Sequence, residues 1–282
     1  MMATTRLLLL MLATWTSAWQ PAQALTAPAG IPNEGLVMFD ENPFNGSPRG
    51  FYRYDLETDE LSLITEVAMT ADRLTGFTWH PVERRIYAGS DQGRMYTIEL
   101  LTGEVNLVGQ VPVSAQFPFI RGLTFKPATN ELFAMGFGPR LYRIDTTTAA
   151  STLLGTVPAL DGGLAFTPDG TLYGWTPVAR LMEVDPITLE TVVISSSPFG
   201  IVSNLTSAPD GTLYGSGWQQ GGIVEIDRTI GSGQLIAQYN EHVNGVIGVF
   251  YYVIPEPSST VLCLGFVLGL ACTTRRMPCR GQ

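Results

Sequence analysis

The sequence predicts an all-β protein, folded as a five-bladed β-propeller, on three observations. First, its 30 glycines and 19 prolines show no collagen period, and so many turn residues accompany many short strands. Second, a six-residue phrase recurs at intervals in the forties. Third, each interval contains four short alternating apolar runs separated by turn residues, which is the pattern of a four-stranded blade.

The repeated phrase sets the period of the fold. Its four copies are Gly76-Phe77-Thr78-Trp79-His80-Pro81, Gly122-Leu123-Thr124-Phe125-Lys126-Pro127, Gly163-Leu164-Ala165-Phe166-Thr167-Pro168 and Asn204-Leu205-Thr206-Ser207-Ala208-Pro209. Their starts are 46, 41 and 41 residues apart, and another 41 residues reach Gly245, where a fifth copy is expected to begin. A period of this length indicates one supersecondary unit repeated along the chain.

Three further runs follow each phrase. The second run contains Ile86, Leu132, Leu172 and Leu213, the third begins at Met95, Leu141, Leu181 and Ile223, and the fourth surrounds Leu107, Leu153, Val193 and Leu235. Two second runs are introduced by Pro-Asp-Gly-Thr, at 168–171 and 209–212, which is a hairpin turn. Four antiparallel strands per repeat are therefore predicted.

The copies are out of phase with the chain ends. Residues 35–67 contain a second, a third and a fourth run but no first run, whereas the run Val246 to Val253 has no followers. Pairing this last strand with the N-terminal three completes a blade and closes the ring, which removes exposed sheet edges. The prediction is a propeller over residues 35–253, with five blades of 41–46 residues, preceded by a linker at 25–34.

The first 24 residues have the form of a secretory signal peptide. Arg6 precedes the apolar run 7–13, and Ala22-Gln23-Ala24 is a small-x-small site that signal peptidase would cut after Ala24. The alternative is an N-terminal membrane anchor, but an apolar core of about 10 residues is shorter than the ~20 that span a bilayer. Export is therefore expected.

The C-terminal end carries a second targeting pattern. Residues 258–274 contain no charge and are predicted to form a transmembrane helix, and Arg275 and Arg276 follow at once and should remain cytoplasmic. The triplet Pro255-Glu256-Pro257 stands directly before this helix. A Pro-Glu-Pro triplet, an apolar helix and a terminal arginine cluster resemble the PEP-CTERM sorting tail over residues 254–282.

This resemblance implies an itinerary and says nothing about the domain in front. PEP-CTERM tails are recognised by exosortase, a membrane-embedded cysteine protease of bacteria that make exopolysaccharide. The implied partners are signal peptidase and exosortase, and the implied location is the inner membrane and then the cell surface or extracellular matrix. The tail departs from the pattern by continuing through Met277-Pro278-Cys279-Arg280. A plain C-terminal anchor with a proline-flanked hinge is the alternative.

Charge and cysteine use exclude several functions. The net charge is −9, and the body without the two ends has 12 basic and 24 acidic residues, a net of −12, which disfavours nucleic acid as a partner. All three cysteines, Cys263, Cys272 and Cys279, lie in the tail. The body can therefore form no disulfide, thiolate nucleophile or zinc–cysteine site, and no cofactor is predicted.

The body also resembles propeller repeats of the NHL and SMP-30-like kind. The resemblance rests on Gly-Leu-x-Phe-x-Pro-Asp-Gly-x-Leu-Tyr in residues 163–173. Since this phrase is common to many unrelated propellers, it supports the fold and not an activity.

An acid follows the third run of every blade. These acids are Asp55, Glu99, Asp145, Asp185 and Asp227. A ring of five carboxylates could bind a metal, but a carboxylate that starts a turn also accepts hydrogen bonds from the next backbone N–H groups. We expect the turn role, because acids on outer strands lie too far apart to share an ion.

No catalytic residue is predicted. The two histidines, His80 and His242, are 162 residues apart, and the repeat position of His80 is filled elsewhere by Lys126, Thr167 and Ala208, which suggests a solvent-facing site. The favoured function is a non-catalytic binding or matrix protein of the cell surface or exopolysaccharide layer. The alternative is a secreted propeller hydrolase or lyase acting on a polysaccharide or a small ester.

A ligand site is expected on the face that carries the loops between second and third strands. Arg94, Arg140 and Arg180 precede third strands, and Trp175 and Trp218 occupy the preceding loops. Aromatic faces beside guanidinium groups suit sugars or carboxylates, and extracellular polysaccharide or another envelope component is the expected partner. The alternative is that the arginines support turns and the tryptophans cover blade ends.

Overall fold

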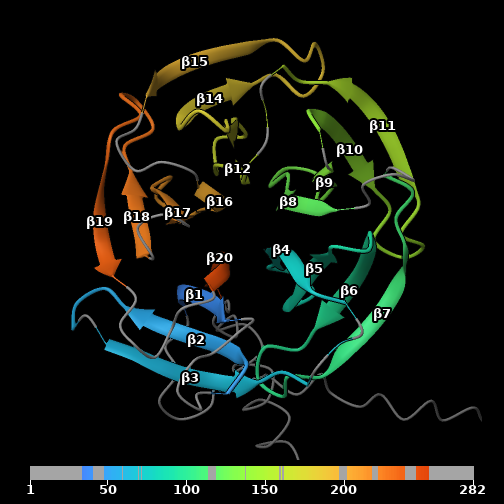
Figure 1. Ribbon diagram of the computed structural model, residues 1–282, viewed down its shortest axis with the longest axis vertical. Helices are drawn as coiled ribbons and strands as arrows, with labels where there is room; N and C mark the ends of the chain where they lie inside the picture. Colours follow the sequence, from blue (N-terminus) through green and yellow to red (C-terminus); the bar gives the residue numbers. More distant parts are fainter. Residues whose placement is uncertain are drawn as a thin grey trace, which may run out of the picture. The chain divides into compact units, whose positions relative to one another are not determined.

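The computed structural model describes a ring of β-sheets. The structure describes residues 34–40, 48–58, 60–68, 70, 72–113, 119–136, 138–158, 160, 162–196, 202–217, 222–238 and 246–253. All of them belong to the compact unit 31–255. In these residues, 20 strands form five four-stranded antiparallel sheets around a common axis (Figure 1). The predicted all-β, five-bladed propeller is confirmed.

The blades follow one another along the chain, and their strands are named a to d from the axis outwards (Figure 1). Blade 1 contains β20 (Val246–Val253), β1 (Glu34–Asp40), β2 (Gly50–Asp55) and β3 (Glu60–Glu66). Blade 2 contains β4 (Leu74–His80), β5 (Arg85–Ser90), β6 (Arg94–Ile98) and β7 (Val105–Gln110). Blade 3 contains β8 (Ile120–Phe125), β9 (Leu132–Gly136), β10 (Arg140–Ile144) and β11 (Ser151–Thr156). Blade 4 contains β12 (Leu164–Phe166), β13 (Leu172–Trp175), β14 (Arg180–Val184) and β15 (Thr191–Ser196). Blade 5 contains β16 (Val202–Ser207), β17 (Leu213–Gly217), β18 (Gly222–Ile226) and β19 (Gly233–Gln238).

The ring closes as predicted, by pairing of the C-terminal strand with the N-terminal blade. β20 runs antiparallel to β1, with Val253 opposite Glu34 and Phe250 opposite Val37. β20 also contacts the inner strands β4 and β16 on its two sides. Closure gives each inner strand a neighbour on both sides and joins the two ends of the propeller chain.

The fifth copy of the phrase begins three residues later than the 41-residue spacing predicted. Gly248 lies opposite Phe39, which lies opposite Phe51, in the arrangement that Gly76, Gly89 and Met95 have in blade 2. Gly248 and not Gly245 is therefore the equivalent of Gly76. The spacing from Asn204 to Gly248 is 44 residues, between the 46 and the 41 of the earlier spacings, and the sequence hides this because Gly245-Val246 resembles the opening of a copy.

Inner strands of neighbouring blades approach closely, which explains the glycine that opens most copies. A Cβ atom on Gly163 would lie 2.2 Å from the backbone nitrogen of Leu205 in blade 5. Neighbouring inner strands are also joined by hydrogen bonds, because the Thr124 hydroxyl accepts the Phe166 N–H at 2.9 Å. The Thr206 hydroxyl accepts the Tyr251 N–H at 3.1 Å in the same way. The phrase therefore encodes contact between blades.

The core lies between the faces of adjacent sheets, and His80 belongs to it. The prediction that His80 faces solvent is wrong, since it is 6% exposed and its ring centroid lies 4.5 Å from that of Phe125. Its Nδ1 accepts the Glu83 N–H at 3.1 Å, and burial lowers its pKa. Thr167 and Ala208 are buried as well, so this position varies inside the core.

The two predicted targeting segments lie outside the described residues. This applies to the signal peptide 1–24, to linker residues 25–33 and to the tail 254–282 with its helix 258–274. Within the described ranges, no helix is long and apolar enough to cross a membrane.

Candidate functional site

The turns divide between two ends of the propeller. In blade 2, His80 pairs with Arg85 and Ile98 with Val105, so the a–b and c–d turns lie at one end of the strands. The b–c turns and d–a connections lie at the other end. We call the first the acidic end, after its turn carboxylates, and the second the arginine end, after Arg94, Arg140 and Arg180, which begin the c strands β6, β10 and β14.

Four of the five acids after the c strands accept turn N–H groups, as expected, whereas the Glu99 carboxylate lies 3.8 Å from the Arg85 guanidinium. The Asp145 carboxylate accepts the backbone N–H groups of Thr147 at 2.9 Å and Thr148 at 2.8 Å, and Asp55 and Asp185 repeat this arrangement. These hydrogen bonds lower the pKa of each carboxyl group. Within the part of the chain that the structure describes, no three His, Cys, Asp or Glu side chains are placed to hold a metal ion.

Arg94 at the arginine end is paired with a buried carboxylate. Its guanidinium donates to Asp72 at 3.0 Å, and the Asp72 side chain is 3% exposed. Ser90 and Tyr96 donate to the same carboxylate at 3.0 and 2.9 Å. This network fastens the segment before β4 to the b–c turn of blade 2, so Arg94 has the structural role that the sequence left open.

The other predicted members of this site differ in whether their side chains are exposed. Arg140 and Arg180 are exposed at the starts of their strands, in adjacent blades. Trp175 is 0% exposed and packs in the cluster that contains Val202 and Leu205, so it offers no ring face to a ligand. The stacking role predicted for Trp175 is therefore replaced by packing. Trp218 lies outside the described residues, and for the arginines the site stays a prediction.

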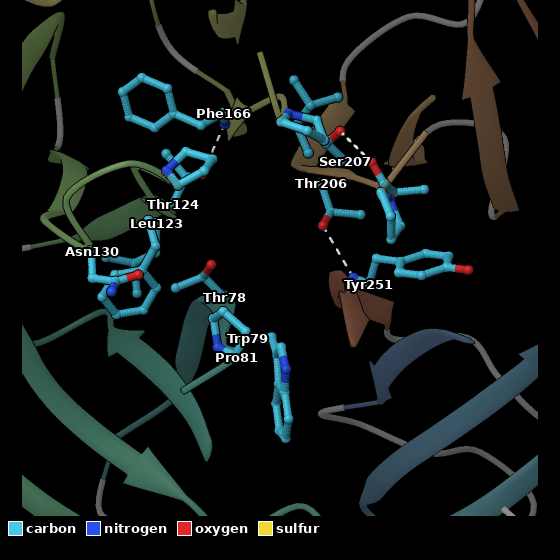
Figure 2. Close-up of a pocket in the computed structure, with 16 residues that line it drawn as sticks. Thr78, Trp79, Pro81, Leu123, Thr124, Asn130, Phe166, Thr206, Ser207 and Tyr251 are labelled. Atoms are coloured by element: carbon cyan, nitrogen blue, oxygen red, sulfur yellow. Dashed lines mark hydrogen bonds between the residues drawn. The ribbon is translucent and has the colours of Figure 1, made fainter. Parts of the chain in front are cut away.

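A pocket opens on the axis at the acidic end, away from the predicted site. Its volume is about 250 Å³, and all five inner strands or their a–b turns contribute to it. Figure 2 shows these side chains around an open centre, with the Thr78 hydroxyl directed into it. The lining residues are Thr78, Trp79, Pro81, Leu123, Thr124, Phe125, Pro127, Asn130, Phe166, Pro168, Leu205, Thr206, Ser207, Ala208, Pro209 and Tyr251. We call this hollow the axial pocket.

The axial pocket is lined by the repeated phrase itself. Strand register gives equivalent positions to Trp79, Phe125, Phe166, Tyr251 and Ser207, so blade 5 has a hydroxymethyl group where the other blades have a ring. The smaller side chain leaves part of this aromatic layer open. The lining provides hydroxyl groups, one amide and ring edges, and its described members include no carboxylate, imidazole, ammonium or guanidinium group.

The axial pocket could have been found from the sequence by comparing the copies with one another. Blade 5 departs from the phrase at Asn204, which replaces glycine, and at Ser207, which replaces an aromatic residue. These two departures are the signal of the pocket that the sequence contains.

The a–b turns form the rim of the axial pocket and carry four carboxylates, and the c–d turns of the outer strands carry eight more at the same end. Twelve carboxylates lie in the described turns at this end: Glu83, Glu131, Asp169 and Asp210 in the a–b turns, and Asp55, Glu57, Glu99, Glu104, Asp145, Asp185, Glu190 and Asp227 in the c–d turns. Three cationic side chains, Arg84, Lys126 and Arg228, share these turns. Three more stand at the strand ends beside them: Arg53 pairs with Asp55, Arg85 with Glu83 and Glu99, and Arg143 with Glu131. Arg228 is committed to Asp169, at 2.5 Å, and hydrogen bonds from Thr167 and Arg228 lower the pKa of that aspartate.

Comparison with known proteins supports the fold alone. No family model and no curated protein matches the chain. Among solved structures, a chain of a nidogen/laminin complex is similar at 12% identity and a TM-score of 0.52, over 77% of this chain and 98% of that one. A structural genomics protein of unknown function from Bacteroides thetaiotaomicron is 13% identical at a TM-score of 0.48, over 59% of this chain and 50% of its own. At these identities the likeness concerns the propeller architecture and not an activity.

Proposed function

We propose that this chain is an exported binding protein of the cell surface or exopolysaccharide layer and that its propeller is a non-catalytic module. Residues 1–24 direct export, the tail 254–282 anchors the chain in the inner membrane, and an exosortase removes the tail. The observation that carries the binding role is the axial pocket, an open hollow whose lining combines hydroxyl, amide and aromatic groups with aliphatic side chains. Such groups hold ligands by hydrogen bonds and contact area.

Three ionisable groups support binding over catalysis because they already have structural partners. The Asp72 carboxylate is occupied by Ser90, Arg94 and Tyr96, and the Asp145 carboxylate by turn N–H groups. His80 is buried against Phe125. General acid–base catalysis requires such groups to face a substrate, and these face the protein.

Mass spectrometry of the protein from its native host tests the itinerary. The mature chain is expected to begin at Leu25 and to lack the tail. An intact Gly281-Gln282 terminus as the main species would contradict processing.

A second experiment separates binding from turnover. Envelope polysaccharide incubated with the purified protein is expected to sediment with it and to keep its length distribution. Shortened chains or released products would favour the hydrolase or lyase.

A further inference from the structure

We propose that the axial pocket binds a protonated amino-sugar unit of a polysaccharide, that is, a sugar carrying a free ammonium group. This inference rests on the proposed binding function and names its ligand class. Three observations lead to it: the size of the pocket, its hydroxyl groups and the charge of its rim.

The size of the axial pocket fits one sugar unit. Its volume of about 250 Å³ is just below the ~300–1,000 Å³ of pockets for drug-sized ligands. That volume equals the share of roughly eight liquid waters. A bulky polymer must therefore present one unit or its end.

The hydroxyl groups are placed to bond a polar ring. Thr124 and Thr206 already accept backbone N–H groups from the next blade, which fixes their oxygen atoms at the pocket wall. A hydroxyl that accepts one hydrogen bond can still donate its own proton, so each can donate to a ligand oxygen. Thr78 projects from the facing wall into the centre (Figure 2). Hydroxyl groups on two sides suit a polyhydroxylated ligand.

The rim selects the sign of the ligand's charge. Glu83 and Asp210 stand two and one residues from the lining prolines Pro81 and Pro209. The excess of carboxylates over cationic groups at this end concentrates cations and repels anions such as uronates. A sugar that carries an ammonium group offers a positive charge to the acidic rim and hydroxyl groups to the pocket wall.

The test uses the full chain purified in detergent and isothermal titration calorimetry. The probes are glucosamine tetramer, its N-acetylated form, galacturonate tetramer and tetralysine. Glucosamine tetramer is expected to bind most tightly, with affinity falling several-fold between 10 and 100 mM salt as the Debye length shortens from about 30 to 10 Å. If the N-acetylated tetramer binds as tightly as glucosamine tetramer, the ammonium group is not recognised. If tetralysine binds as tightly as glucosamine tetramer, the sugar is not recognised. Either result overturns the proposal.

Variants localise the binding. Ser207→Phe restores the aromatic residue of the other blades and should reduce affinity more than tenfold by filling the pocket. Thr78→Val removes one hydroxyl and should cost about fivefold, the usual worth of one hydrogen bond. Unchanged affinity in both variants, with circular dichroism showing intact folding, would overturn the proposal.

A charge pair and its matched control test the rim. Glu83→Gln with Asp210→Asn keeps the oxygen acceptors for Tyr87 and Thr212 and should weaken binding about fourfold, since a charge at ~10 Å in water contributes about twofold. Asp91→Asn removes one charge at the arginine end, keeps the oxygen acceptor for the Arg73 N–H and should leave affinity unchanged. An equal effect per charge removed at the two ends would refute a role for the rim.

Failure here is distinguishable from failure of the proposed function. If pocket variants bind envelope polysaccharide as tightly as the parent chain, this site is wrong while export and binding stand. If the parent chain is not exported or cleaves the polymer, the proposed function is wrong whatever the tetramers show.

Discussion

The contact between blades 1 and 2 makes Gly103→Ala a sharp test of the packing. Gly103 ends the c–d turn of blade 2 with φ +69°, and a Cβ atom there would lie 2.0 Å from the Glu66 carbonyl oxygen of blade 1. An alanine with left-handed φ costs about 1–2 kcal/mol. Relieving the clash requires backbone movement, which costs typically about 1–3 kcal/mol more. We expect a loss of about 2–5 kcal/mol in the free energy of unfolding.

Gly170→Ala is the matched control, since Gly170 has φ +87° and nothing within 4 Å of the added Cβ. It should cost only the backbone term, so the two variants should differ by about 1–3 kcal/mol. In a domain of this size that difference corresponds to about 2–12 °C in Tm, measured by circular dichroism. Equal losses in the two variants would refute the close approach of blades 1 and 2 at this turn.

Three further predictions concern buried and titrating groups. Trp175→Ala should reduce the free energy of unfolding by about 3–5 kcal/mol, the usual cost of emptying a large buried site, and a loss below about 1 kcal/mol in urea unfolding would contradict its full burial. Ser216→Ala should stabilise by about 1–3 kcal/mol, because the Ser216 hydroxyl is buried without a hydrogen-bond partner; a lower urea midpoint would contradict this. The lowered folded-state pKa of Asp145 means that its contribution to stability is present above the ordinary value of 3.8 and is lost as pH falls below it. Asp145→Asn should therefore weaken the acid-induced fall in Tm below about pH 4, and an unchanged pH profile would count against the turn role.

The fold was predictable because each blade repeats the same local chemistry. The strand order of one blade is predicted by the alternating runs, the Pro-Asp-Gly-Thr turns and the acid after each c strand. The period then predicts how many times this blade is repeated. Closure followed from the missing first run before Leu36, since a blade without its inner strand leaves apolar surface uncovered. The register of Gly248 was not predictable, because an alternating apolar run reads the same from several starting points and only pairing with β1 decides among them.

The candidate site was less predictable, because exposure depends on neighbours that are distant in sequence. Trp175 and His80 both stand where turn residues are frequent, but strands of the next blade cover them. The pairing of Arg94 with Asp72 joins the segment before β4 to the start of β6, which are 22 residues apart in the sequence. Residue type therefore predicted which groups could bind a ligand, and packing decided which of them remain accessible.

Departures from the repeat identify where function can enter such a protein. The inner strand of blade 5 departs from the repeat at two positions. Ser207 stands where the other blades have an aromatic residue, and Asn204 stands where they have glycine. Asn204 is 1% exposed, and both polar atoms of its side chain lack a hydrogen-bond partner, as does the hydroxyl of Ser216, its partner in register. Each unpaired buried group costs about 1–3 kcal/mol. Blade 5 thus combines a large share of the pocket lining with buried polar groups that lower its stability. Such unpaired buried groups are expected where a sequence departs from the rules of stable packing to form a binding site. The first substitutions should therefore be made in blade 5.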